Sequence, residues 1–112
     1  EAEIMIDGVT AVSGAGPAYF FLLMEEMIKA GVELGLTAET AKTLVLQTAK
    51  GAALLAESAQ EQGEDPAVLR QKITSPDGTT EAALKTFTAE GFEAIVKKAL
   101  KAARDRGRAL SG

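Results

Sequence analysis

The sequence predicts an all-α fold, a helical bundle of about five helices in one domain, and three observations favour it. Aromatic residues make up only 4% of the 112 residues, whereas strands prefer aromatic and β-branched residues. Alanine, the best helix former, is abundant. Apolar residues recur at helical spacing along most of the chain, with glycine, proline and hydroxyl residues between the runs. Only the lead-in, residues 1–13, is compatible with a strand.

The first expected helix follows the lead-in. Pro17 suits the first position of a helix, which we expect to run to about Leu34. Residues 19–24, in its first half, are apolar on every side. Because a helix that is apolar all round is normally buried all round, we expect another chain or domain to cover part of it.

The second expected helix begins after a glycine and a threonine. Gly35 suits the left-handed position that ends a helix, and Thr37 is a natural N-cap for the next one, which should run to about Ala59. Its middle, residues 49–53, is nearly all small. A partner helix crossing there would explain this run, and so would the helix propensity of alanine alone.

Three shorter helical segments complete the chain. Asp65-Pro66 supplies an N-cap followed by proline at the first helical position, which is a strong start signal. A turn at residues 74–79 and a break at Gly91 separate these segments. We expect the three helices to end near Ile73, Thr88 and Ala109.

Composition excludes several kinds of site. The chain has no Cys and no His, so it lacks thiol nucleophiles, disulfides, zinc sites of the usual kind and the Ser-His-Asp triad. The net charge of −4 argues against a general nucleic-acid binder. The longest wholly apolar run, Ala18 to Met24, is too short to span a bilayer. We therefore expect no metal, nucleic-acid or membrane partner; and because the chain starts at Glu1 without Met, we expect it to be a fragment of a longer protein.

One turn carries the strongest candidate site. Residues 73–80 (Ile-Thr-Ser-Pro-Asp-Gly-Thr-Thr) should form a tight turn leading into a helix capped by Thr79 or Thr80. Such a junction exposes unpaired N–H groups at the positive end of a helix dipole, beside the hydroxyls of Ser75, Thr79 and Thr80. This arrangement suits a carboxylate or a phosphate. A capped turn with nothing bound explains the same residues.

The segment Ser13-Gly14-Ala15-Gly16-Pro17 is a second, weaker candidate. Its small residues indicate either flexible punctuation before a helix or a close approach of backbone to a ligand. The Gly-Ala-Gly pattern alone is weak, and it lacks the preceding strand that a dinucleotide fingerprint requires.

Three segments together resemble a known family. They are Ser13-Gly14-Ala15-Gly16-Pro17-Ala18-Tyr19, residues 30–36 (Ala-Gly-Val-Glu-Leu-Gly-Leu), and Thr74-Ser75-Pro76-Asp77-Gly78-Thr79-Thr80 with Glu90-Gly91-Phe92 after a helix. Their order and spacing are similar to those of the C-terminal domain of pyrroline-5-carboxylate reductase, the last enzyme of proline biosynthesis. The resemblance covers essentially the whole chain.

The resemblance implies a division of labour between two domains. An N-terminal Rossmann domain, absent from this chain, would bind NADPH or NADH. Residues 1–112 would form the C-terminal dimerisation and substrate-binding domain, similar to that of 6-phosphogluconate dehydrogenase-like reductases. Two copies would interlock as a homodimer, in some relatives assembled into a larger ring, in the cytoplasm. The full-length enzyme would reduce 1-pyrroline-5-carboxylate to L-proline, and the isolated fragment would be inactive.

Site residues carry over onto matching positions. The resemblance implies that Ser75, Gly78, Thr79 and Thr80 bind the substrate carboxylate, and that the catalytic Thr80 hydroxyl lies near the ring nitrogen. Asp77 stands where many family members have Gly, which puts the placement of residue 77 in doubt. Four residues of the other segment would lie near the nicotinamide: Ser13, Gly14, Gly16 and Pro17.

Two other functions are compatible with the sequence. The chain could be a non-catalytic helical homodimerisation module whose threonine-rich turn only caps a helix. It could also be the helical domain of another imine or hydroxy-acid dehydrogenase. The second alternative is disfavoured, because those relatives place a lysine on the first long helix and Lys29 lies too far along it.

Overall fold

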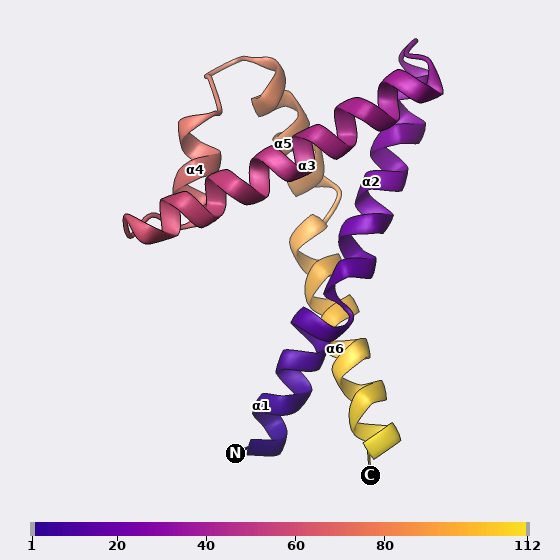
Figure 1. The fold of residues 1–112 in the computed structure, drawn as a ribbon, viewed down its shortest axis with the longest axis vertical. Coiled ribbons are helices and arrows are strands. Elements are labelled where there is room, and N and C mark those ends of the chain that lie inside the picture. The colour runs from indigo at the N-terminus through magenta and orange to yellow at the C-terminus, as the bar shows by residue number, and fades with distance from the viewer. Residues whose placement is uncertain (1, 112) are drawn as a thin grey trace. The chain divides into compact units, whose positions relative to one another are not determined.

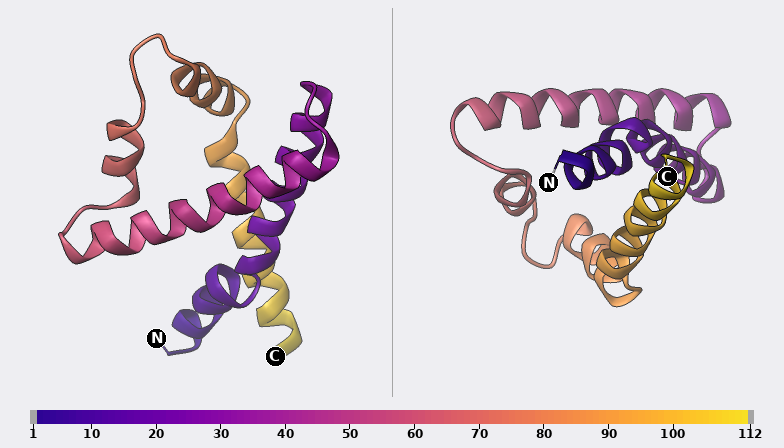
Figure 2. Two further views of the ribbon diagram at one scale, coloured as in Figure 1. Left: turned by 45° about the horizontal axis from the view of Figure 1, so that its top comes forward. Right: turned by 90° about the horizontal axis from the view of Figure 1, so that it is seen from below.

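The computed structural model describes the backbone of residues 2–111 and the side chains of residues 4–110. The described residues form helices and turns without a strand (Figure 1, Figure 2), so the all-α prediction is confirmed. The five expected helices are all present, close to their predicted bounds. In chain order the elements are α1 (Ala2–Val9), the π-helix η1 (Thr10–Gly14), α2 (Gly16–Glu33), α3 (Ala38–Glu61), α4 (Pro66–Lys72), α5 (Thr79–Ala89) and α6 (Phe92–Ser111).

The lead-in is helical, so the expectation of a possible strand there is wrong. The described part of the lead-in forms α1 and most of η1. The polar pair Asp7-Gly8 does not end α1. The Asp7 carboxylate instead forms an ion pair with Arg108 of α6, a partner 101 residues away, and accepts a hydrogen bond from its Nε at 3.2 Å. Local sequence carries no signal for a contact of that separation.

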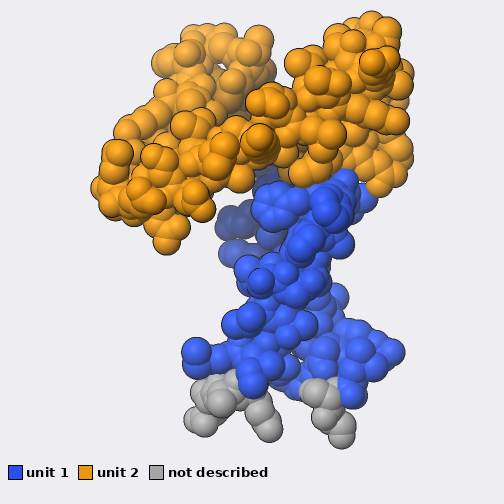
Figure 3. All heavy atoms as spheres, viewed as in Figure 1, with its two compact units in different colours: residues 1–22, 85–112 blue, residues 23–84 orange. Residues whose placement is uncertain are grey.

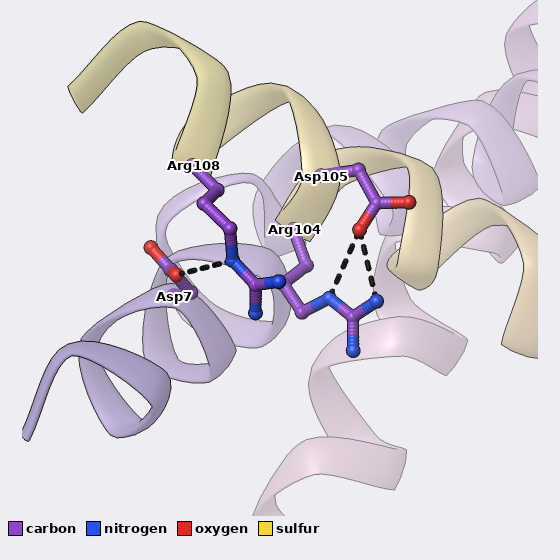
Figure 4. Close-up of polar contacts among 4 residues, drawn as sticks. All are labelled: Asp7, Arg104, Asp105 and Arg108. Carbon is purple, nitrogen blue, oxygen red and sulfur yellow. Dashed lines mark hydrogen bonds and ion pairs between the residues drawn. The ribbon is translucent and has the colours of Figure 1, made fainter. Parts of the chain in front are cut away.

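The chain divides into two compact units, residues 1–22 with 85–112 and residues 23–84 (Figure 3). In the first unit, α1 and η1 pack against α6. Figure 4 shows the Asp7–Arg108 pair beside Arg104 and Asp105 of α6, and the hydrogen bonds from Arg104 lower the pKa of the Asp105 carboxyl. The rings of Phe87 and Phe92 meet edge to face with centroids 5.3 Å apart.

The second unit is organised by helix ends. Gly35 has φ +112°, and the Leu36 and Gly35 N–H groups donate to the Gly31 and Val32 carbonyls at 3.0 Å. This is a Schellman motif, which satisfies the last carbonyls of α2. Thr37 then caps α3 as predicted, accepting a hydrogen bond from the Thr40 N–H at 3.1 Å.

Local contacts also fix the end of α3 and the start of α4. Gly63 has φ +80°, and the Glu64 N–H donates to the Ala59 carbonyl at 2.9 Å, which gives α3 a second Schellman motif. The Asp65 carboxylate accepts from the Val68 N–H at 3.2 Å and Pro66 opens α4, so the predicted start signal is confirmed.

The core of the described chain is very small. Its buried apolar residues are only Ala11, Ala41, Val45 and Ala59. Large apolar side chains of α2 are exposed instead, including Phe20 (65%), Phe21 (63%) and Leu22 (60%). A chain of this length normally buries about two-thirds of its surface, so these faces need further cover.

One helical run would fit a membrane by length and composition. Residues 4–33, with a mean hydropathy of 1.2 over the best window, satisfy both criteria, and 11% of that window is buried. The sequence-based expectation of no such span considered only wholly apolar residues. The observation is weak, because core and interface helices of soluble proteins satisfy the same criteria.

Candidate functional site

The predicted turn between α4 and α5 is present and tight. The Gly78 N–H donates to the Ser75 carbonyl at 3.1 Å, which makes Pro76 and Asp77 the central residues of a four-residue turn. Asp77 has φ +57°. A positive φ at the third position, after proline at the second, is typical of a type II turn. Glycine is favoured at that position, and Asp is among the few other residues that tolerate it.

Gly78 is needed for space and not for a positive φ. A Cβ added there would lie 3.2 Å from the Ser75 carbonyl oxygen and 3.4 Å from the Ser75 Cβ. The turn can therefore close this tightly because residue 78 has no side chain. Asp and Gly both tolerate positive φ, but of these two residues only Asp77 adopts it.

Gly78 also takes the cap position of α5. Its carbonyl accepts the first helical hydrogen bond, from the Ala82 N–H at 3.2 Å, and Thr79 is the first helical residue. The prediction that Thr79 or Thr80 is the N-cap is therefore wrong by one or two residues. The physical reason is that glycine is also accepted at an N-cap, and the turn closes early enough to place Gly78 there.

The helix start leaves backbone donors available. Among the described residues, no protein acceptor pairs with the backbone N–H groups of Thr79 and Thr80. These groups lie in the first turn of the 11-residue α5, at the positive end of its dipole. The predicted site residues Ser75 and Thr79 are exposed, and Gly78 and Thr80 are half-buried. The structure thus gathers Ser75, Gly78, Thr79 and Thr80 in one turn that can accept an anion.

Two residues outside the predicted set shape this turn. Glu81 Oε1 accepts a hydrogen bond from the Asp77 N–H at 3.0 Å, and Thr74 Oγ1 donates to the Arg70 carbonyl at 2.5 Å. Thr74 thereby fastens the turn to the end of α4, and Glu81 fastens it to α5. The signal for Glu81 was present, because an acidic residue at the third helical position often bonds back to the residues before its helix.

The second candidate segment contains an unusual backbone. Ala15 donates its N–H to the Thr10 carbonyl at 2.9 Å, five residues back, as in a π-helix. Helix α2 then begins at Gly16, one residue before the predicted Pro17. Ser13 and Gly14 are exposed and Gly16 is buried. This segment belongs to the first unit and the Ser75–Thr80 turn to the second.

The described residues could contact only part of a nicotinamide cofactor. No described residue forms a strand, so the strand–turn–helix unit that holds a dinucleotide pyrophosphate is not found in the described part of the chain. A Cβ added at Gly16 would meet no heavy atom within 4 Å. Gly16 is nevertheless buried, whereas Ser13 and Gly14 are exposed, so only these exposed residues could line a flat ring of the cofactor.

Comparisons with known proteins identify the family of the chain. Residues 3–110 match the family described as pyrroline-5-carboxylate reductase dimerisation. The chain belongs to this family. It is 59% identical over 109 residues to the pyrroline-5-carboxylate reductase of Pseudomonas aeruginosa, covering 97% of this chain and 39% of that protein.

Solved structures of the family show the same fold. A pyrroline-5-carboxylate reductase from Coxiella burnetii superposes with a TM-score of 0.89 at 44% identity, over 98% of this chain and 40% of that one. The Plasmodium falciparum pyrroline carboxylate reductase, solved with NADP bound, gives a TM-score of 0.86 at 37% identity, over 96% and 42%. The chain thus spans about two-fifths of the length of the reductases that it matches.

Proposed function

We propose that this chain is the C-terminal domain of a pyrroline-5-carboxylate reductase, which reduces 1-pyrroline-5-carboxylate to L-proline with NADPH or NADH. The domain supplies the homodimer interface and the site for the substrate carboxylate. The Ser75–Thr80 turn carries the proposal, because it combines free helix-start N–H groups with hydroxyls. Family membership over residues 3–110 supports the same function. The proposed protein is soluble and cytoplasmic, and its dimers can assemble into a larger ring.

The turn explains how a carboxylate could be held without a basic side chain. The backbone N–H groups of Thr79 and Thr80 and the Ser75 hydroxyl would donate to its oxygens. The backbone donors are fixed before binding, because the turn is closed by the Ser75–Gly78 hydrogen bond and held by Glu81. Fixed donors at a helix start cost little reorganisation when an anion arrives.

Thr80 has a separate role in the proposed reaction. When bound, the nicotinamide cofactor supplies the hydride that adds to the imine carbon. The Thr80 hydroxyl would hold a hydrogen bond at the ring nitrogen, where the proton must be kept or gained as charge shifts during the reaction. This bond would strengthen in the transition state, and such bonds raise kcat.

The proposal is tested in the full-length enzyme by Thr80→Val, which keeps the side-chain shape and removes the hydroxyl. Loss of one transition-state donor should cost about 2–4 kcal/mol, which is roughly a 30- to 1,000-fold loss of kcat/KM. Thr88→Val, near the far end of α5, is the matched control. A Thr80→Val enzyme within threefold of wild type would return Thr80 to a structural role.

Ser75→Ala should have a different kinetic signature. A contact to the carboxylate is made equally in the ground state and the transition state, so its loss should raise KM for 1-pyrroline-5-carboxylate and leave kcat nearly unchanged. Steady-state kinetics of the same full-length enzyme measure both parameters. A fall in kcat at constant KM would contradict the assignment of Ser75 to the carboxylate.

The alternative, a non-catalytic homodimerisation module, makes a distinct prediction. Under that alternative the full-length protein would dimerise and show no turnover of 1-pyrroline-5-carboxylate with either nicotinamide cofactor. Under our proposal, turnover requires the full-length protein, and the isolated 112-residue chain should be inactive because the described residues contain no nucleotide fold.

A further inference from the structure

The π-helix η1 lacks one helical hydrogen bond at a buried position. In an α-helix the Ala15 N–H would donate to the Ala11 carbonyl, four residues back. Here it donates to Thr10 instead, at 2.9 Å. Ala11 is 3% exposed, so its carbonyl is shielded from water. A buried carbonyl without a donor is costly, and another group must satisfy it.

Tyr19 supplies the missing donor. Its hydroxyl donates to the Ala11 carbonyl at 2.6 Å, across eight residues, and the bond is partly buried. If residues 10–15 returned to α-helical geometry, the Ala15 N–H would compete for the same carbonyl. The hydrogen bond from Tyr19 therefore stabilises the π-form selectively, and Tyr19 is the only tyrosine in the chain.

The π-turn determines how the following residues are presented. A π-turn inserts one extra residue into a helix, and such turns are frequent at functional sites. Ser13, Gly14 and Gly16 lie within this turn or directly after it. A change to α-geometry would rotate Ser13 and Gly14 about the helix axis relative to α2, by about 100° for one residue.

We propose that Tyr19 is a positioning residue for the nicotinamide cofactor: by satisfying the Ala11 carbonyl, it locks the π-turn that presents Ser13 and Gly14. This inference rests on the proposed function, because it assumes that the Ser13–Pro17 segment lies near the cofactor. Tyr19 itself acts only through this backbone.

The first test is Tyr19→Phe in the full-length protein. The Kd for NADPH, measured by fluorescence titration without substrate, should rise about three- to tenfold, as expected for loss of one hydrogen bond. KM for 1-pyrroline-5-carboxylate should stay within twofold, and hydrogen exchange should accelerate in peptides covering residues 10–16. Ser58→Ala, which removes an exposed hydroxyl on α3, is the control.

A second variant keeps the inference testable if Tyr19→Phe does not fold. Deleting Val12, an exposed residue of the π-helix (63%), should convert η1 to α-geometry while keeping α1 and α2 in phase. It should raise the Kd for NADPH to the same extent as Tyr19→Phe, and the two changes together should add nothing further.

Failure of this inference differs from failure of the proposed function. A folded Tyr19→Phe protein with an unchanged Kd for NADPH, or fully additive effects of the two variants, would overturn the positioning role while the reductase function stands. A wild-type full-length protein without turnover of 1-pyrroline-5-carboxylate would overturn both.

Discussion

At the scale of single residues, the turn before α5 depends on two different properties of neighbouring positions. Asp77 adopts a positive φ of +57°, and Gly78 leaves room for the Ser75 carbonyl, which a Cβ would approach to 3.2 Å. Asp77 is thus the one non-glycine residue with positive φ in the described chain.

This division predicts opposite effects for two substitutions at Asp77. Asp77→Gly should keep or raise stability, by up to about 1 kcal/mol, because glycine adopts positive φ without strain. Asp77→Ala should lower it by about 1 kcal/mol. Urea unfolding of the 112-residue chain at a fixed concentration measures both. Equal stability of the two variants would show that residue 77 is not strained.

Gly78→Ala should damage the site more than the fold. The added Cβ must push the Ser75 backbone away, so the turn between Ser75 and Thr79 opens. In the full-length enzyme we expect KM for 1-pyrroline-5-carboxylate to rise about tenfold or more, the effect of losing one good hydrogen bond to a charged group. An unchanged KM would indicate that the carboxylate binds elsewhere.

At the scale of elements, helix ends carry most of the local specification. Gly35 and Gly63 both adopt positive φ and both belong to Schellman motifs. Gly35→Ala and Gly63→Ala should each lower stability by about 1–2 kcal/mol. Gly107→Ala is the control: Gly107 lies inside α6 with no heavy atom within 4 Å of an added Cβ. That change should raise stability by about 0.5–1 kcal/mol, and thermal unfolding distinguishes the three.

The same helix ends explain how much of the fold was predictable. Caps such as Thr37 and Asp65 and terminators such as Gly35 act through residues within one turn, so their sequence signals are local. The helices that begin or end at these residues were therefore predicted. The π-helix was not predicted, because its stability depends on Tyr19 reaching back eight residues to Ala11. The helical lead-in was missed for the same kind of reason, since Arg108 pairs with Asp7 from the other end of the chain.

The candidate site was predicted in its composition but not in its detail. Proline followed by Asp-Gly and two threonines has a local turn chemistry, so Ser75, Gly78, Thr79 and Thr80 could be grouped from sequence. Which residue takes the cap position depends on where the turn closes, and that is set by the contact between Gly78 and Ser75.

At the scale of the whole molecule, the small core predicts an obligate homodimer. Phe20, Phe21 and Leu22 are largely exposed, and surfaces of this kind mark interfaces. We expect an interlocked homodimer that buries well above about 2,000 Å² in total. Light scattering without detergent should return a dimer mass at micromolar concentration, and Leu22→Glu should shift it toward the monomer. A wild-type monomer at that concentration would contradict the prediction.

The scarcity of buried side chains also determines the order of the folding reaction. With Ala11, Ala41, Val45 and Ala59 as its only buried apolar residues, one described chain has little to gain by folding before it meets another. Stability is then inseparable from protomer concentration, and collision of two chains becomes a kinetic step. Refolding by dilution from urea should show a major phase whose rate increases in proportion to chain concentration. Across a hundredfold dilution series, a concentration-independent rate would mean that each chain acquires its structure alone.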